Sequence, residues 1–335
     1  MSRTTRHAVV LLSLWIGCTA ALASEADPFI GRWALTIPGG GAGWLGVTQE
    51  GYLDGSILWG GGSVVPVDSV FTMNGDLYVI RLHKVERKDA AGKVVRTQTF
   101  PEALMARIDG DTLQLVQVQP NRNGIGVEQR EFTGKRIPPL PAKPDLSKVK
   151  FGKPIALFDG TSLDGWKLVN PNDRNGWSIE DGVLVNKPIQ PQGRHVSYGN
   201  LRTVAEFEDF NLKLEVSVNK NENSGVYLRG IYEVQVADTY GRNLDSHNMG
   251  GVYSRITPRV AAEKPAGEWQ TMDITLVERH VTVILNDQKI IDNEPILGCT
   301  GGALWSDEFK PGPIYLQGDH TGVHYRNIIL TPIVR

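Results

Sequence analysis

Cysteine is almost absent from this chain, and this restricts the chemistry open to it. The 335 residues include two cysteines, Cys18 and Cys299. Cys18 lies in an N-terminal segment that we expect to be removed, so the mature monomer would keep Cys299 alone and form no internal disulfide. No basic residue adjoins Cys299 in the sequence, so we expect it to be a small buried hydrophobic residue rather than a reactive thiol.

An excess of charge is also missing. The chain carries 35 Lys and Arg residues against 37 Asp and Glu residues, a formal net charge of −2. We therefore expect no basic field that would hold a nucleic acid or an anionic membrane surface. A P-loop and a strand followed by G-x-G-x-x-G are absent as well, which argues against a bound nucleotide.

Long hydrophobic runs are limited to one short stretch near the N-terminus. Ala8–Ile16 is too short to span a bilayer as a helix, so we expect no membrane span. It follows Arg3 and Arg6 and precedes Ala21-Leu22-Ala23, the pattern of a secretory signal peptide with cleavage after Ala23. Residues 1–23 are therefore predicted to be a signal peptide, Ser24 the first mature residue, and the location periplasmic or secreted.

Lipid attachment at Cys18 is the less favoured alternative to this cleavage. Cys18 follows Gly17, but the preceding Trp15 and Ile16 fit the lipoprotein pattern of bacteria poorly.

A long amphipathic helix is lacking too, and short alternating runs bounded by glycine predict an all-β protein. Residues 27–136 are predicted to form a small domain, a β-meander or a small barrel, with turns at Asn74-Gly75 and Asp109-Gly110-Asp111. Five prolines in Ile137–Pro154 predict an extended linker over residues 137–153. Residues 154–335 then show many short strands, typical of a two-sheet antiparallel jelly-roll sandwich.

The most informative stretch is Asn223–Asp238, two alternating runs joined at Gly230. Strand periodicity places apolar residues on one side and polar residues on the other. The expected polar face combines a guanidinium, a carboxyl and an amide, which suggests a site; the residues are Tyr227, Arg229, Glu233 and Gln235. The alternative is an ordinary half-exposed sheet with a cross-strand Arg229–Glu233 ion pair.

Several motifs of the second domain occur in a fixed order, and together they resemble the 3-keto-disaccharide hydrolase domain family over about residues 153–333. The motifs are LFDGTSLDGW at 157–166, NSGVYLRG at 223–230, YEVQV at 232–236, GEWQ at 267–270 and PGPIYLQGDH at 311–320. The resemblance implies a concanavalin-like jelly roll that cleaves glycosides already oxidised to a ketone at sugar C3. The ketone would have to come from a separate sugar 3-oxidoreductase.

Such a ketone acidifies the C2 proton, so the group at C1 can leave by elimination and water can add afterwards. The reaction needs a base, a proton donor for the leaving oxygen, and a cation or metal near the C3 enolate. We expect Glu233 and His320 to be the acid and base, and Arg229 to hold the enolate or an adjacent hydroxyl. Direct hydrolysis, with two opposed carboxylates, stays open. The expected substrate-binding residues are Gln235, Tyr227, Asp238, Gln317 and Trp305.

Two alternatives remain open from the residues alone. A divalent metal is possible, because Asp and His residues offer oxygen and nitrogen ligands in the loops, although no standard metal-binding spacing is present; the candidates are Asp238, Asp245, His247, Asp319 and His320. A non-catalytic carbohydrate-binding protein is the other functional hypothesis, since a jelly roll serves both purposes. Charged residues at the centre of the concave face would favour catalysis, and an aromatic platform there would favour binding.

Overall fold

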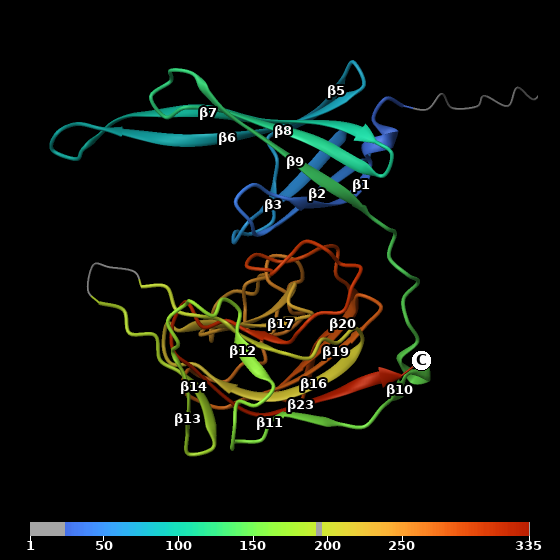
Figure 1. Ribbon diagram of the computed structural model, residues 1–335, viewed down its shortest axis with the longest axis vertical. Helices are drawn as coiled ribbons and strands as arrows, with labels where there is room; N and C mark the ends of the chain where they lie inside the picture. Colours follow the sequence, from blue (N-terminus) through green and yellow to red (C-terminus); the bar gives the residue numbers. More distant parts are fainter. Residues whose placement is uncertain (1–23, 192–195, 335) are drawn as a thin grey trace, which may run out of the picture.

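The computed structural model describes residues 24–191 and 196–334 and shows an all-β protein (Figure 1). The predicted signal peptide, its cleavage site after Ala23 and Cys18 lie outside the described residues. Among the residues described, no helix is both long and apolar enough to cross a membrane.

The N-terminal part is one antiparallel sheet in the strand order β4-β3-β2-β1-β9-β8-β7-β6-β5. Two meanders are joined by the pairing of β1 with β9, and β4 and β5 stand at the two ends, so the sheet is curled and open rather than a closed barrel. After a short 3-10 turn, η1 (Asp27–Phe29), its strands are β1 (Gly31–Thr36), β2 (Ala42–Gln49), β3 (Leu53–Trp59), β4 (Val65–Pro66), β5 (Ser69–Met73), β6 (Asp76–Lys88), β7 (Val94–Asp109), β8 (Thr112–Pro120) and β9 (Val127–Ile137).

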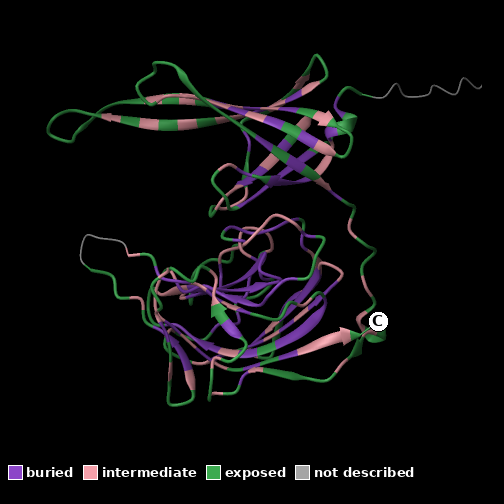
Figure 2. Cartoon of the chain, in the orientation of Figure 1, coloured by how far each residue is buried: buried purple, intermediate pink, exposed green. Residues whose placement is uncertain are grey.

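The hairpin turns of this sheet lie where the sequence predicts them. Asn74 and Gly75 connect β5 to β6 with φ values of 54° and 82°, the left-handed conformations of a two-residue turn. A core containing Trp33, Leu45 and Leu104 fills the concave side. Strands β6 and β7 continue beyond this core as a ribbon, and toward its tip the residues are half-buried or exposed (Figure 2).

The C-terminal part is a sandwich of two antiparallel sheets that enclose a large apolar core. One sheet has the order β13-β14-β23-β16-β19-β20-β21, with β10 and β11 also paired to β23. Its strands are β10 (Lys150–Phe151), β11 (Ile155–Phe158), β13 (Trp177–Glu180), β14 (Val183–Asn186), β16 (Phe210–Ser217), β19 (Gln270–Val277), β20 (His280–Leu285), β21 (Gln288–Pro295) and β23 (Val323–Val334).

The second sheet has the order β12-β15-β22-β17-β18 and contains the hairpin formed by β17 and β18. Leu212 and Ile274 of the first sheet pack in the same core as Val226 and Val234 of this one. Such alternating apolar positions on facing strands are what a two-sheet sandwich requires. The strands are β12 (Trp166–Leu168), β15 (Leu201–Thr203), β17 (Asn223–Leu228), β18 (Tyr232–Ala237) and β22 (Tyr315–Leu316).

The proline-rich segment runs from one part to the other and is only partly irregular (Figure 1). It contains a 3-10 turn, η2 (Leu146–Lys148), for which the Asp145 side chain accepts a hydrogen bond from the Ser147 backbone N–H. Its last residues form β10, whose Lys150 pairs with Val334. The segment expected to be a linker therefore ends as an edge strand of the sandwich.

The two parts also touch directly, because the apolar core of the sandwich continues into the N-terminal sheet through Ala42, Trp44 and Leu58. The guanidinium carbon of Arg255 lies 4.2 Å from the centre of the Trp44 ring. Gly298 packs on the same indole so closely that a Cβ there would lie 2.4 Å from its nitrogen. Apolar contact and a cation–π pair thus fix the N-terminal sheet on the loop side of the sandwich.

Candidate active site in the C-terminal sandwich

A cavity of about 200 Å³ opens beside the β17–β18 hairpin and contains several of the polar groups that the sequence singles out, both acid–base candidates among them. Strands β17, β18 and β22 supply its floor, and loops from both parts of the chain supply its walls. The lining residues are Gly61, Asn200, Asn223, Tyr227, Glu233, Tyr253, Gly301, Gly302, Tyr315, Gln317, Asp319 and His320.

The hairpin register places Tyr227 opposite Glu233. Arg229 and Gly230 have φ values of 54° and 68°, so a tight turn of two left-handed residues closes the hairpin. Every residue of β18 is buried, so the alternative of an ordinary half-exposed sheet with its polar face in solvent is wrong. The loops that follow β18 and precede β22 cover that face, which leaves its polar groups in a cavity rather than in bulk water.

Glu233 is the central carboxyl of the cavity and is 3% exposed. Its side chain occupies the space that a side chain at Gly225 would fill, since a Cβ there would lie 2.3 Å from Oε1 of Glu233. Burial raises the pKa of Glu233 to about 8, although the Tyr227 hydroxyl and the charge of His320 act in the opposite direction. Burial therefore favours the protonated form of Glu233 at neutral pH.

The hydrogen bonds of Tyr227 are consistent with this protonation. Its hydroxyl oxygen lies 2.9 Å from Oε2 of Glu233 and 2.8 Å from the carbonyl oxygen of Gly301. A phenol has one proton to donate, and a carbonyl can only accept. When Tyr227 donates to Gly301, the protonated carboxyl of Glu233 can donate to Tyr227, and all three groups are satisfied.

Asp319 and His320 form a second proton-transfer group at the cavity. Nδ1 of His320 lies 2.7 Å from Oδ1 of Asp319, and the His320 side chain is 49% exposed. The hydrogen bond to Asp319 raises the pKa of His320. It also holds the proton of the neutral imidazole on Nδ1, which leaves the lone pair on Nε2 free to accept a proton.

Amide and aromatic side chains complete the lining. The rings of Tyr227 and Tyr315 stack with centroids 4.1 Å apart, and both rings are buried, so they offer no open platform for a sugar face. Oδ1 of Asn223 and Oε1 of Gln317 are buried and have no hydrogen-bond partner within the described residues. Buried amide oxygens of this kind are suited to accept hydrogen bonds from the hydroxyls of a bound sugar.

Arg229 does not line the cavity, which corrects its expected place beside the substrate. Its Nη2 donates to the carbonyl oxygens of Glu308 and Lys310, at 2.8 Å and 2.5 Å, and its side chain is buried. The left-handed backbone of the turn interrupts the strand alternation, so the side chain leaves the face shared by Tyr227 and Glu233. Arg229 anchors the loop before β22.

Gln235 and Asp238 also lie outside the cavity lining. Gln235 shares the face of Glu233, but its side-chain oxygen accepts a hydrogen bond from the backbone N–H of Val236 at 3.1 Å, and its main chain pairs with Gly250 and Gly251. Asp238 accepts a hydrogen bond from the backbone N–H of Asn221 at 2.9 Å and so closes the far end of the hairpin. The expected sugar contacts of these two residues are not supported by their positions.

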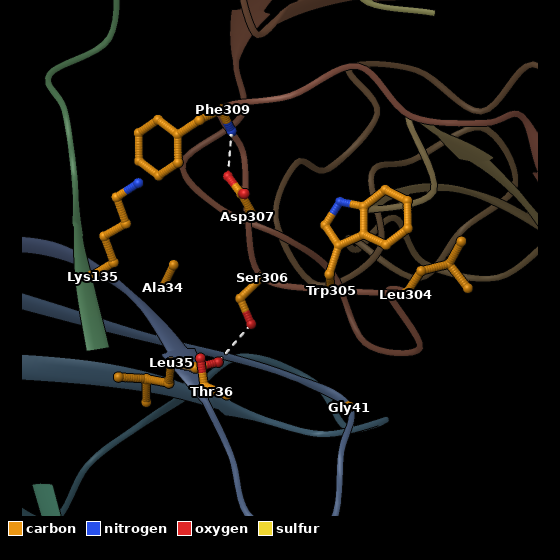
Figure 3. Close-up of a pocket in the computed structure, with 10 residues that line it drawn as sticks. All are labelled: Ala34, Leu35, Thr36, Gly41, Lys135, Leu304, Trp305, Ser306, Asp307 and Phe309. Carbon is orange, nitrogen blue, oxygen red and sulfur yellow. Dashed lines mark hydrogen bonds between the residues drawn. The ribbon is translucent and has the colours of Figure 1, made fainter. Parts of the chain in front are cut away.

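Trp305 lies in a different cavity, of about 290 Å³, between the N-terminal sheet and the sandwich (Figure 3). One side of this cavity comes from β1, where the carbonyl oxygen of Leu35 accepts a hydrogen bond from Ser306 at 2.6 Å. The Lys310 ammonium lies 4.0 Å from the centre of the Trp305 ring. Trp305 therefore belongs to the contact between the two parts, and its expected role as a sugar platform at the active site is not supported.

The expected metal ligands are not assembled into one cluster. Asp319 and His320 contact each other, as do Asp245 and His247, whose ring Nδ1 lies 3.4 Å from the Asp245 carboxylate. Among the described residues, no group of three or more His, Cys, Asp and Glu side chains is arranged to hold a metal ion. Cys299 is buried, as expected, and burial raises the pKa of its thiol to about 12.

Sequence comparison decides the family of the C-terminal sandwich. Residues 153–331 match the model of the 3-keto-alpha-glucoside-1,2-lyase-like domain, which covers the cavity except for Gly61. The chain belongs to this family. A 3-keto-disaccharide hydrolase of Bacteroides thetaiotaomicron is 26% identical over 168 residues, which cover 41% of this chain and 57% of that protein.

Solved structures of presumed glycosyl hydrolases from Parabacteroides distasonis also align with this member of the family. One is 28% identical, with a TM-score of 0.43, and the alignment covers 58% of this chain and 93% of that one. Another is 21% identical, with a TM-score of 0.43, over 54% of this chain and 94% of the other.

Several residues that line the cavity were not identified as site residues from the sequence. Tyr315 stands inside a recognised motif, and the alternation of β22 was a signal for it, whereas Asp319 was expected only as a possible metal ligand. Asn200, Tyr253 and Gly61 stand in loops far away in the sequence. No local pattern marks a loop residue that tertiary packing brings to a distant strand.

Proposed function

We propose that this protein is an exported enzyme that cleaves glycosides carrying a ketone at sugar C3, by elimination followed by hydration. The observation that carries the proposal is a buried carboxyl, Glu233, whose pKa of about 8 keeps it protonated in a cavity that it shares with the Asp319–His320 pair. One proton donor and one proton acceptor are what this elimination requires. Membership of the 3-keto-alpha-glucoside-1,2-lyase-like family supports the substrate class.

In the proposed first step, Nε2 of neutral His320 accepts the C2 proton of the sugar. The electron pair of the C2–H bond forms the enolate that is conjugated with the C3 ketone. The C1–O bond then breaks with its electron pair, and the leaving oxygen takes the proton of Glu233. The products are the released alcohol and an unsaturated 3-keto sugar.

In the proposed second step, water adds to C1 of the unsaturated sugar and a proton returns to C2. His320, now protonated, is the source of that proton, and the ionised Glu233 accepts one from the water. Both groups regain their starting states, and the sum of the two steps is hydrolysis. Asn223 and Gln317, whose amide oxygens are buried and unpartnered, would hold the sugar hydroxyls.

The size of the cavity supports a substrate unit of one sugar ring. About 200 Å³ is below the roughly 300–1,000 Å³ typical of pockets for drug-sized ligands. A single ring could be enclosed there, while a larger leaving group would extend out of the cavity. The ketone would be supplied by a sugar 3-oxidoreductase acting earlier, since the proposed steps contain no net oxidation.

The deciding experiment incubates the chain from Ser24 onward with a 3-keto-glucoside and with the unoxidised glucoside, and measures aglycone release. Release from the keto compound alone is expected. A parallel assay with chelator tests whether a divalent ion takes part. Release from both compounds would instead indicate ordinary hydrolysis, and absence of release with measurable sugar binding would establish the carbohydrate-binding alternative.

A further inference from the structure

A loop of the N-terminal sheet reaches the cavity described above. Gly60–Gly62 follows β3, and Gly61 is one of the cavity-lining residues. It is also the one lining residue outside residues 153–331, the part of the chain that matches the family model. The cavity of this chain therefore has a wall that the family domain does not provide.

The loop is packed tightly against the sandwich at this point. A Cβ at Gly301 would lie 2.3 Å from the carbonyl oxygen of Gly62 and 2.9 Å from that of Gly61, so only glycine fits there. Immediately after the loop, the Ser63 hydroxyl lies 3.0 Å from Nε2 of His247. The backbone N–H of Val64 donates to the Ser254 hydroxyl at 2.7 Å. These contacts hold the glycine loop at the cavity.

The contacts also place the loop on a particular side of the cavity. Gly301, which the loop touches, accepts a hydrogen bond from Tyr227, and Tyr227 is in turn bonded to Glu233. In the proposed reaction Glu233 protonates the leaving oxygen. The loop therefore stands on the side where the leaving group would lie.

We propose that Gly61, held in place by the contacts of its loop, forms the wall of the leaving-group subsite, and that its lack of a side chain sets the size of leaving group that this enzyme accepts. This inference rests on the proposed function and extends it to substrate selection. A leaving group that extends out of the cavity past Gly61, such as an alcohol or a single sugar, would meet only the bare glycine backbone there.

Gly61 is a favourable position for a test, because a Cβ there meets no atom within 4 Å and its backbone is outside the left-handed region. Gly61→Leu would therefore fold and extend a side chain into the subsite. Gly62→Leu is the matched control, since its backbone is equally permissive and a Cβ there meets only the Trp59 carbonyl, at 3.9 Å. Gly62 does not line the cavity.

The experiment measures kcat/KM of the wild type and both variants on methyl 3-keto-glucoside and on a 3-keto-disaccharide, with circular dichroism as the check of folding. Gly61→Leu is expected to lower kcat/KM on the disaccharide by roughly tenfold or more, the size of effect that one misfitting side chain has in a pocket. Its value on the methyl glycoside should stay within about twofold of the wild type. Gly62→Leu should behave as the wild type on both.

Equal losses on both substrates for Gly61→Leu, or no loss on either, would overturn the leaving-group subsite while leaving the proposed reaction intact. A wild-type enzyme that releases neither aglycone would overturn the proposed reaction itself, and the subsite with it. The wild-type assay thus separates the two failures.

Discussion

Two glutamates of this chain are equally buried, one in each part, and their surroundings differ. Glu102 on β7 is 2% exposed and Glu233 on β18 is 3% exposed. Glu102 is met by the Arg81 guanidinium at 3.1 Å and by the His83 ring at 2.5 Å. Glu233 has the neutral Tyr227 hydroxyl as its hydrogen-bond partner.

This difference shows when a buried carboxyl has a structural role and when it is available for chemistry. A buried carboxylate beside a guanidinium is compensated within the fold, and removing it leaves the buried partner uncompensated. A buried carboxyl without such compensation keeps its proton up to a higher pH, which for Glu233 is a pKa of about 8. It can then release that proton where a substrate develops negative charge.

The largest expected effect on catalysis comes from replacing the protonated carboxyl of Glu233 by an amide. Glu233→Gln keeps the shape but cannot protonate the leaving oxygen, so kcat on a 3-keto-glycoside should fall by about 10²–10⁴-fold. Glu102→Gln should leave kcat unchanged, because Glu102 lies in the N-terminal sheet away from the cavity. Steady-state kinetics of the two variants side by side measures this. Comparable losses in both would mean that burial alone, rather than position, explains Glu233.

The same pair of variants should respond oppositely in stability at alkaline pH. The pKa of Glu233 is raised in the folded state, so between about pH 4.5 and 8 the folded state binds more protons than the unfolded state. The contribution of Glu233 to the free energy of unfolding therefore falls as the pH rises through that window. Glu233→Gln removes this loss, because glutamine does not ionise. Its melting temperature at pH 8.5 should exceed that of the wild type by about 2–4 °C for each kcal/mol recovered.

Glu102→Gln should lower stability at the same pH, because Arg81 and His83 lose their buried carboxylate. The expected loss is about 1–3 kcal/mol, typical of a disrupted buried hydrogen bond. Thermal melts of both variants across pH 5–9 are the measurement. A stabilised Glu102→Gln protein would contradict the assignment of Glu102 to a compensated ion pair.

A smaller effect is expected from uncoupling His320 from its carboxylate. The hydrogen bond that His320 donates to Asp319 raises the pKa of His320, and in the proposed reaction activity requires neutral His320. Asp319→Asn should therefore move the rising limb of the kcat/KM profile to lower pH. The falling limb, which reflects Glu233 near pH 8, should stay in place or move little. A shift of the falling limb alone would reverse the assignment of acid and base.

The smallest effect on catalysis is expected at Arg229. Arg229→Lys cannot hold both the Glu308 and Lys310 carbonyls with the same geometry, so stability should drop by about 1–3 kcal/mol. In the folded protein kcat should remain within about threefold of the wild type, because Arg229 does not line the cavity. Denaturant melts and initial rates measure the two quantities, and a loss of kcat well beyond that range would return Arg229 to the reaction.

Sequence reasoning recovered the all-β architecture, because short alternating runs bounded by turn residues are local features. It also placed Tyr227 and Glu233 together, since strand alternation and a two-residue turn determine which side chains share a face. It failed at Arg229, where two left-handed residues end the alternation. It failed again at Trp305, because a loop has no periodicity from which the direction of a side chain can be inferred.

The amino-acid sequence by itself thus determined the strands, their faces and the family of the C-terminal sandwich. Tertiary structure alone decided that the polar face is covered, that buried Glu233 has a tyrosine hydroxyl as its side-chain partner, and that Gly61 stands beside Gly301, which lies 240 positions later in the chain. The physical reason is that alternation and turn conformation depend on neighbouring residues. Desolvation and the walls of a cavity depend on groups that only the folded chain brings together.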